Sequence, residues 1–137
     1  MESSKEFKAL IRECHKAKER AYCPYSNFRV GCAVLTEDGT MFTGCNVENA
    51  CYGLAMCAER NAIIKAVTEG HRKFQAIAVG TDIKDKFKGP CGPCRQFLVE
   101  FGECDLYMVK PDLTYMKFPH DLLPMGFGPA DLLAEKI

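Results

Sequence analysis

Apolar residues recur with helical spacing over the first twenty residues of the chain. They fall three or four positions apart between residues 4 and 20, so that they share one face of a helix. The residues that make this face are Phe7, Leu10, Ile11, Cys14 and Ala17. Serines just before the repeat can cap the first turn. The pattern predicts an amphipathic helix over residues 4–20.

The next two hydrophobic stretches are typical of paired strands. Residues 28–36 (FRVGCAVLT) and 41–49 (MFTGCNVEN) flank the sequence Glu-Asp-Gly-Thr at residues 37–40. Asp-Gly supplies the backbone freedom that a tight hairpin turn needs. We therefore expect two antiparallel strands joined by this turn.

Helical and strand patterns alternate through the second half of the chain. Residues 57–70 have apolar side chains at helical spacing and end on Gly70, a favourable helix C-cap. Residues 74–81 (FQAIAVGT) form a continuous apolar run that is typical of a buried strand. A third helix is expected over residues 94–102, opened by Pro93. Two more strands are expected at residues 105–109 and 114–118.

This order of elements predicts the class of fold. A helix, a hairpin, a helix, a strand, a helix and two strands can form one mixed sheet with helices packed on its faces. A chain of 137 residues, 47% of them hydrophobic, is long enough for one domain with a real core. We therefore expect residues 1–137 to form a single α/β domain.

Charge and hydropathy narrow the class of partner. Lys plus Arg and Asp plus Glu number 18 each, so no overall positive field is present to hold a nucleic acid or an anionic membrane. No apolar run approaches the roughly 20 residues that span a bilayer, and the N-terminal sequence lacks the apolar region of a secretion signal. We expect a cytoplasmic protein that acts on a small molecule. These features do not exclude its presence in the nucleus as well.

The nine cysteines indicate reduced thiols rather than a disulfide scaffold. Their number is odd and no secretion signal accompanies them. Four lie among apolar neighbours and are expected to be buried thiols, namely Cys14, Cys32, Cys45 and Cys104. Cys23 and Cys51 lie in polar, turn-rich segments, and the residues alone assign them no chemistry.

The remaining cysteines raise a choice between redox and metal chemistry. Cys91-Gly92-Pro93-Cys94 at a helix N-terminus would lower the pKa of a redox thiol and of a metal-bound thiol alike. A thioredoxin-like motif is expected early in the chain, whereas this one lies two thirds of the way along. It also follows another helix that begins with a cysteine, Cys57. Two such helix starts, brought together by a sheet, would place three sulfurs around one ion.

Three sulfur ligands favour catalysis over a structural role. Structural zinc sites use four protein ligands, whereas catalytic sites use three and leave a position for water. Glu59 lies two residues after Cys57 and can point past the same helix end. There it could take a proton from the water and deliver it to a substrate. The alternative for Glu59 is a solvated glutamate that stabilises the first helical turn.

These motifs together resemble a known family. Cys57-Ala58-Glu59, followed by Pro-Cys-x-x-Cys, matches the zinc-deaminase signature in its three-cysteine form. The chain resembles the small homotetrameric cytidine deaminases along nearly its whole length. The matching segments are YCPYSNFRVG, GCNVENACY, CAERNAI, GPCGPCRQF and LLPMGFGP. The resemblance implies a three-layer α/β/α sandwich with a mixed five-stranded sheet.

The resemblance also implies an activity and a metal site. Cytidine and deoxycytidine would be hydrolysed to uridine and deoxyuridine with release of ammonia, as in pyrimidine salvage. One Zn²⁺ per chain would be held by Cys57, Cys91 and Cys94, with Glu59 as the proton shuttle. Three thiolates leave the site with a net negative charge, so a nearby cation is useful. The family places an arginine on the ligand sulfurs, which corresponds to Arg60; Gln96 and Arg95 are weaker candidates for supporting contacts.

Substrate contacts are implied by the same resemblance. Strand alternation would send Asn46 and Glu48 to one side, where the family grips the ribose. Phe28 would pack against the pyrimidine, and Phe127 and Tyr52 would reach toward the site of a neighbouring subunit in a homotetramer. The residues that complete the implied set are Ala50, Cys51 and Ala58. Read without the family, the polar residues would be turn formers, Phe28 a core residue, and Phe127 the tip of a mobile loop.

Other functions remain open from the residues alone. A zinc-stabilised interaction module would need a fourth ligand such as Cys104 or His120. A nucleic-acid editing deaminase would need a basic, aromatic-lined channel, which neutral charge and the absence of tryptophan disfavour. A deaminase for a modified aminopyrimidine nucleoside is the nearest alternative. The three histidines, His15, His71 and His120, are expected to be solvated.

Overall fold

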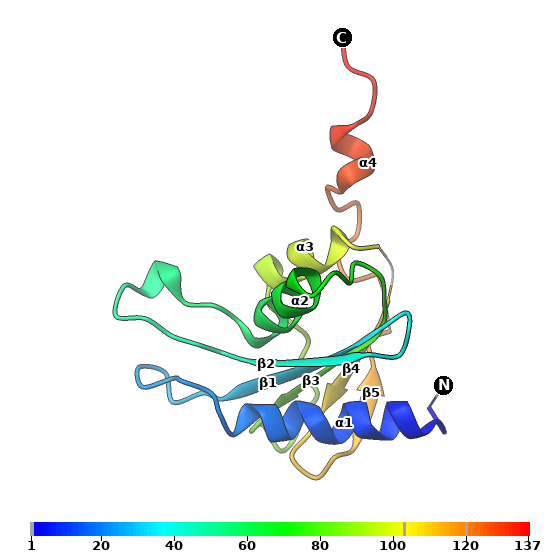
Figure 1. Ribbon diagram of the computed structural model, residues 1–137. Coiled ribbons are helices and arrows are strands. Elements are labelled where there is room, and N and C mark those ends of the chain that lie inside the picture. Colours follow the sequence, from blue (N-terminus) through cyan, green and yellow to red (C-terminus); the bar gives the residue numbers. More distant parts are fainter. Residues whose placement is uncertain (1, 103, 120) are drawn as a thin grey trace.

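The computed structural model describes residues 2–102, 104–119 and 121–137 and shows a three-layer arrangement. Helix α1 covers one face of a five-stranded sheet, and helices α2 and α3 cover the other (Figure 1). The elements are α1 (Lys5–Lys18), β1 (Val30–Thr36), β2 (Met41–Cys45), the 3₁₀ helix η1 (Tyr52–Leu54), α2 (Ala58–Thr68), β3 (Phe74–Thr81), α3 (Gly92–Val99), β4 (Asp105–Val109), β5 (Tyr115–Lys117) and α4 (Pro129–Leu132). The predicted α/β fold with a mixed sheet is confirmed.

The sheet topology brings two helix starts to one edge. The strand order is β2-β1-β3-β4-β5, and only the β3–β4 pair is parallel. Helix α2 runs back across the sheet before β3 begins, and α3 starts after β3 has ended. Both helices therefore have their N-termini at the edge where β3 ends.

Two apolar layers hold the helices to the sheet. Alternation along β1 sends Cys32 and Val34 toward α2, while Ala33 and Leu35 face α1. The residues of α1 in this packing are Phe7, Leu10, Ile11 and Cys14, and those of α2 are Ala58, Ala62, Ile63 and Ala66. Because β1 and β3 are covered on both faces, they read in the sequence as continuous apolar runs.

Gly31 permits α1 to lie directly against β1. A Cβ atom at this position would stand 2.0 Å from the carbonyl oxygen of Cys14 and 2.5 Å from the main-chain nitrogen of Lys18. Backbone atoms cannot rotate away, so Gly31→Ala is expected to destabilise the protein by about 3 kcal/mol. The change should appear as a lower urea midpoint.

Gly53→Ala is the matched control, because a Cβ at Gly53 would meet nothing within 4 Å outside its own turn of chain. Its free energy of unfolding should stay within about 0.5 kcal/mol of wild type. Equal urea midpoints for the Gly31 and Gly53 variants would contradict this account of the α1–β1 contact.

Some sequence expectations differ from the structure. The second strand, expected to run to residue 49, ends at Cys45 because the chain then leaves β1 and Val47 pairs with Tyr22 and Met56 instead. His15 is half-buried and not freely solvated: its ring covers Gly80, and its Nε2 lies 3.2 Å from the carbonyl oxygen of Val109. Burial, as the main cause, lowers the pKa of His15.

His71 is partly buried and lies 3.7 Å from the carboxylate of Asp38. His120 falls outside the described residues. None of the helices in the described part of the chain combines the length and apolar character needed to cross a membrane.

Candidate metal centre

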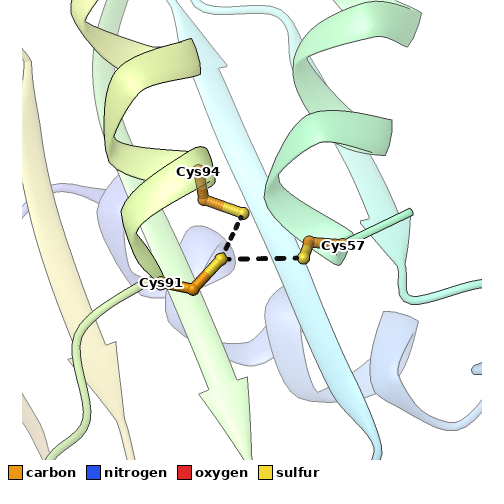
Figure 2. A group of neighbouring side chains, drawn as sticks. All are labelled: Cys57, Cys91 and Cys94. Carbon is orange, nitrogen blue, oxygen red and sulfur yellow. Dashed lines mark hydrogen bonds between the residues drawn. The ribbon is translucent and has the colours of Figure 1, made fainter. Parts of the chain in front are cut away.

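Three cysteine sulfurs meet where α2 and α3 begin (Figure 2). Cys57 is the N-cap of α2, Cys91 is the N-cap of α3, and Cys94 lies one turn further along α3. Their sulfur atoms all lie within 4.8 Å of one another. The Sγ–Sγ distance is 3.9 Å from Cys57 to Cys91 and 3.4 Å from Cys91 to Cys94. The expectation that two cysteine-bearing helix starts would meet is confirmed.

The donor set fits zinc. Sulfur is a preferred zinc ligand, and the positive ends of two helix dipoles stabilise thiolates. Cys91 is exposed, Cys57 is partly exposed and Cys94 is buried, so the cluster is open to solvent on one side. Within the described residues, this is the one group of three or more potential metal ligands.

A fourth protein ligand does not come from Cys104. Cys104 packs against the hydrophobic core formed by α2, α3 and the sheet, and it is not a member of the sulfur group. His120, the other residue considered, lies outside the described part of the chain. The described residues thus provide three ligands and leave one side of the cluster open.

Two of the clustered cysteines have pKa values shifted in opposite directions. The pKa of Cys57 is lowered to about 5, first by a hydrogen bond with Cys94 and also by the guanidinium of Arg60. Hydrogen bonding to Cys57, together with burial, raises the pKa of Cys94. Arg60 donates from Nη2 to the Sγ of Cys57 at 3.1 Å. The cation expected beside the sulfurs is therefore in contact with one of them.

Glu59 is a buried carboxyl group beside this cluster. It is 5% exposed, although it is the second residue of α2. Its pKa is raised, chiefly by burial and secondarily by the negative charge of Cys57. Glu59 is thus removed from bulk water. It is not the solvated first-turn glutamate that was the alternative hypothesis. A carboxyl group with a raised pKa can both accept and return a proton.

Asn46 and Glu48 are brought close to Phe28, but by loop contacts instead of strand alternation. Asn46 accepts from the N–H of Val30 at 2.9 Å and donates to the carbonyl oxygen of Phe28 at 2.8 Å. Glu48 accepts from the main-chain N–H groups of residues 25 and 26 and from the hydroxyl group of Ser26. The latter contact is the first cause of its lowered pKa. Both side chains therefore hold the loop that carries Phe28, an exposed residue.

The remaining expected substrate contacts fall into two groups. Ala50, Cys51 and Tyr52 are exposed on a segment that extends away from the sheet (Figure 1), and Tyr52 is 74% exposed. The side chain of Ala58 is fully buried in the core, so the group it can offer is its main-chain N–H in the first turn of α2.

Phe127 and its neighbours form the last part of the expected set. The side chain of Phe127 is 57% exposed, and its carbonyl oxygen accepts a hydrogen bond from Gln96 at 2.7 Å. Gln96 therefore binds the main chain of Phe127. The expectation from the sequence was a supporting contact with the sulfur cluster instead. Arg95 donates to the carbonyl oxygen of Pro90 and lies over the ring of Phe118.

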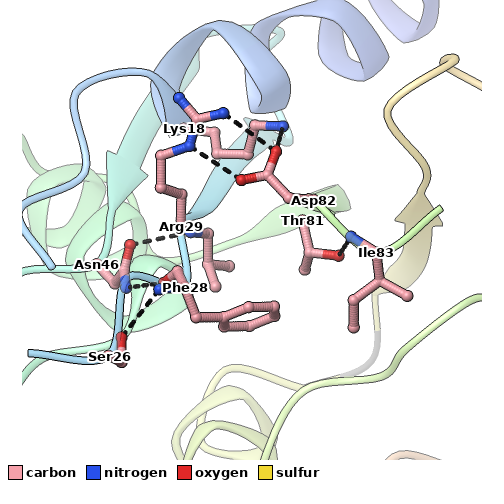
Figure 3. A network of polar contacts seen from close by, with 9 residues as sticks. Lys18, Ser26, Phe28, Arg29, Asn46, Thr81, Asp82 and Ile83 are labelled. Carbon is pink, nitrogen blue, oxygen red and sulfur yellow. Dashed lines mark hydrogen bonds and ion pairs between the residues drawn. The ribbon is translucent and has the colours of Figure 1, made fainter.

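Sequence reasoning missed a polar group that lies close to Phe28. Lys18, Arg29 and Asp82 meet there in an ion-pair network (Figure 3). Lys18 occupies the buried face of α1, where a lysine within the apolar repeat was the available signal. The identity of its partner, 64 residues away, could not be read from the local pattern.

Comparison with known proteins decides the family. Residues 4–110 match the model of the cytidine and deoxycytidylate deaminase zinc-binding region. The chain belongs to this deaminase family. The matched residues include all three clustered cysteines and Glu59, and the resemblance read from the motifs is confirmed.

Curated members of the cytidine deaminase family align over nearly the whole chain. A probable cytidine deaminase from Dictyostelium discoideum is 48% identical over 134 residues, which cover 97% of this chain and 91% of the relative. A cytidine deaminase from Halalkalibacterium halodurans is 51% identical over 127 residues, or 90% and 95% of the two chains. The likeness to these relatives therefore extends beyond residues 4–110.

A solved structure agrees with the fold. The crystal structure of cytidine deaminase from Burkholderia pseudomallei superposes with a TM-score of 0.82 at 44% sequence identity. The match covers 88% of this chain and 98% of the other. The three-layer sandwich of this protein is thus the fold of a cytidine deaminase.

Proposed function

We propose that this protein hydrolyses cytidine and deoxycytidine to uridine and deoxyuridine, releasing ammonia, as an enzyme of pyrimidine salvage. The observation that carries the proposal is the group of three sulfurs within 4.8 Å of one another, with the buried carboxyl group of Glu59 at the same helix start. Three protein ligands on zinc leave a position for water and substrate. A carboxyl group beside that position can move the protons that the reaction requires.

The proposed metal site uses Cys57, Cys91 and Cys94 as ligands to one Zn²⁺. When bound, Zn²⁺ supplies the Lewis acidity that makes water a nucleophile at neutral pH. Arg60 neutralises part of the thiolate charge through its contact with Cys57. With the ion bound, this contact of Arg60 would limit the negative charge that three thiolates place on the site.

Glu59 is the proposed proton carrier in both halves of the reaction. Its carboxylate accepts a proton from the attacking water and donates it to N3 of the pyrimidine, which makes C4 electrophilic. The water oxygen bonds to C4, and Glu59 then carries the second proton from this oxygen to the exocyclic amine. The C4–N bond breaks, ammonia leaves, and the product keeps one oxygen atom from water.

The nucleoside would lie against the loop that Asn46 and Glu48 hold. We assign these two side chains to the ribose hydroxyls and the Phe28 ring to the pyrimidine. We also assign the exposed Ala50, Cys51 and Tyr52 and the main chain of Ala58 to the substrate's surroundings. The proximity of Asn46 and Glu48 to Phe28 supports this assignment.

Replacing Asn46 or Glu48 by alanine should weaken the use of cytidine more than the use of free cytosine, which has no ribose. Hydrogen bonds to a charged group contribute about 1.5–3 kcal/mol, so kcat/KM for cytidine should fall about ten- to hundred-fold in Glu48→Ala. The informative quantity is the ratio of kcat/KM for cytidine to that for cytosine. Glu48→Gln is the control for loop structure, because an amide oxygen can still accept from the N–H groups of residues 25 and 26. Equal losses on both substrates would assign these residues to folding alone.

A substrate panel tests the function itself. The loss of absorbance that accompanies deamination should be measured with cytidine, deoxycytidine, free cytosine and a single-stranded oligonucleotide. Efficient turnover is expected for the two nucleosides and poor turnover for the oligonucleotide. A preference for the oligonucleotide would point to a nucleic-acid editing enzyme, and turnover of modified aminopyrimidine nucleosides alone would redefine the substrate.

We further propose a homotetramer whose active sites are shared between subunits. Tyr52 and Phe127 are exposed by 74% and 57%, and Met125 beside Phe127 is fully exposed. The segment that ends in α4 extends away from the sheet and helices (Figure 1). Exposed aromatic tips on extended segments indicate a protein partner. If these exposed side chains entered the active site of a second copy, they would cover the substrate there.

Mixed oligomers of two impaired variants should regain activity. Glu59→Ala keeps the reaching loops, and Phe127→Ala keeps the metal ligands and the proton carrier, so some mixed sites would have both groups intact. After refolding the variants together, activity should exceed the average of the separate preparations in the proportion set by random mixing. Glu59→Ala mixed with Glu59→Gln is the control, since these two cannot complement each other. If native mass spectrometry shows mixed oligomers that have only the average activity, Phe127 acts within its own chain.

A further inference from the structure

A polar network outside the cysteine cluster joins three segments beside Phe28 (Figure 3). Its centre is the carboxylate of Asp82, which follows β3 and begins the loop that leads to Cys91. Lys18, at the end of α1, donates from Nζ to Asp82 Oδ1 at 2.5 Å. Arg29 donates from Nε to Oδ2 at 2.9 Å and from Nη2 to Oδ1 at 3.2 Å. Residues distant in sequence are thus tied to one carboxylate.

Lys18 makes Asp82 a fixed point of the fold. The Lys18 side chain is 7% exposed, so its ammonium group has little water and depends on the Asp82 carboxylate. Hydrogen bonds, first of all from Arg29, lower the pKa of Asp82. The carboxylate of Asp82 therefore has a fixed position and a negative charge. It can hold the exposed side chain of Arg29 in one orientation.

Arg29 connects this fixed point to the loop before β1. Asn46 binds the main chain on both sides of Arg29, through the carbonyl oxygen of Phe28 and the N–H of Val30. Successive side chains of an extended segment point to opposite sides. In Figure 3 the guanidinium of Arg29 points toward Asp82, while the ring of Phe28 points away from it. The Arg29–Asp82 contact and the two Asn46 hydrogen bonds thus hold the backbone from which the Phe28 ring projects.

We propose that Arg29 and Asp82 are positioning residues that orient Phe28 for packing against the pyrimidine. This inference rests on the proposed function and adds to it the residues that determine nucleoside affinity. A bidentate arginine–carboxylate pair fixes orientation as well as distance. Since Phe28 would contact the ring before and during the reaction, losing the pair weakens binding and leaves the chemical step nearly unchanged.

Arg29→Gln is the variant that tests the proposal. The side chain of Arg29 is 43% exposed, and its removal leaves Lys18 paired with Asp82. Asp82→Asn, by contrast, would leave the buried ammonium group of Lys18 without its counter-charge and could prevent folding.

In Arg29→Gln, KM for cytidine should rise about three- to ten-fold while kcat stays within about two-fold of wild type. The dissociation constant for the product uridine, measured by calorimetry, should rise by the same factor. Arg29→Lys keeps one charged donor toward Asp82 and should recover most of the affinity.

Lys117→Gln is the matched control for charge and exposure. It removes one cation from an exposed ion pair, Lys117 with Asp105 at 3.1 Å. That pair lies at the opposite end of the parallel strands, because Asp105 is aligned with Ala76 near the start of β3. Its kinetics and uridine affinity should equal those of the unmodified protein.

Two outcomes would overturn the proposal. One is an unchanged KM and an unchanged uridine affinity in Arg29→Gln. The other is a reduced kcat at unchanged KM, which would show only a loss of correctly folded protein. The unmodified protein is assayed in the same series, so an absence of cytidine turnover there would refute the proposed function and not the positioning role alone.

Discussion

Replacing Glu59 by glutamine should lower kcat for cytidine by at least about 10²- to 10⁴-fold, the range typical of positioned acid–base catalysis. The amide has nearly the same shape but cannot accept a proton from water. Because Glu59 is buried at the start of α2 and is not one of the three clustered sulfur ligands, zinc content and thermal stability should be nearly unchanged. The measurements are single-turnover kinetics and metal analysis on the same preparation.

Glu69→Gln is the control for the Glu59 experiment. Glu69 is an exposed glutamate that caps the other end of the same helix, so its replacement should leave turnover intact. Retention of more than about a tenth of the turnover in Glu59→Gln would contradict the role assigned to Glu59, since acid–base catalysis contributes more than that.

The second large effect is expected from the metal ligands. Alanine at Cys57, Cys91 or Cys94 should remove both the bound zinc and the activity, because two sulfurs do not hold the ion in the geometry that three provide. A chelator should inactivate the unmodified protein, and added Zn²⁺ should restore it. Metal analysis should give one zinc per chain before chelation.

Cys104→Ala is the control that also tests the structural-site alternative. Cys104 lies apart from the three clustered sulfurs, so the variant should keep its zinc and most of its activity. Loss of zinc in Cys104→Ala would indicate a fourth protein ligand and a closed site. Full activity in metal-free protein would refute the zinc-dependent mechanism.

Much of the fold follows from local patterns. The helical repeat that contains Phe7 and Leu10, the Asp-Gly turn and the apolar run at residues 74–81 each determine an element through contacts between near neighbours in sequence. The meeting of Cys57 with Cys91 could also be predicted, because each of these cysteines begins a helix. Two such helices bring their sulfurs together when both start at the same edge of the sheet.

The contacts that could not be predicted depend on partners far away in the sequence. Lys18 is buried because Asp82, 64 residues later, supplies its counter-charge. His15 is half-buried because Gly80 has no side chain and leaves space for the imidazole ring. Gln96 binds the carbonyl oxygen of Phe127 at a distance of 31 residues. Hydrophobic periodicity contains no information on such pairs.

The loop residues illustrate the same limit within the candidate site. Alternation along a strand was expected to align Asn46 and Glu48, yet β2 ends at Cys45. Their side chains nevertheless converge on the loop that carries Phe28, because the main-chain groups of that loop need hydrogen-bond partners. The family motif identified Asn46 and Glu48 from the sequence. The hydrogen bonds that hold their side chains were found only in the structure.

Hydrolysis of cytidine in water enriched in oxygen-18 tests the central claim most directly. The zinc-loaded protein should convert cytidine to uridine and release an equal amount of ammonia, and mass spectrometry should find one heavy oxygen in each uridine molecule. Its position at C4 would show that water attacks the carbon that loses the amine. Failure of the zinc-loaded protein to form uridine, or uridine that lacks the heavy oxygen, would contradict hydrolytic deamination at this site.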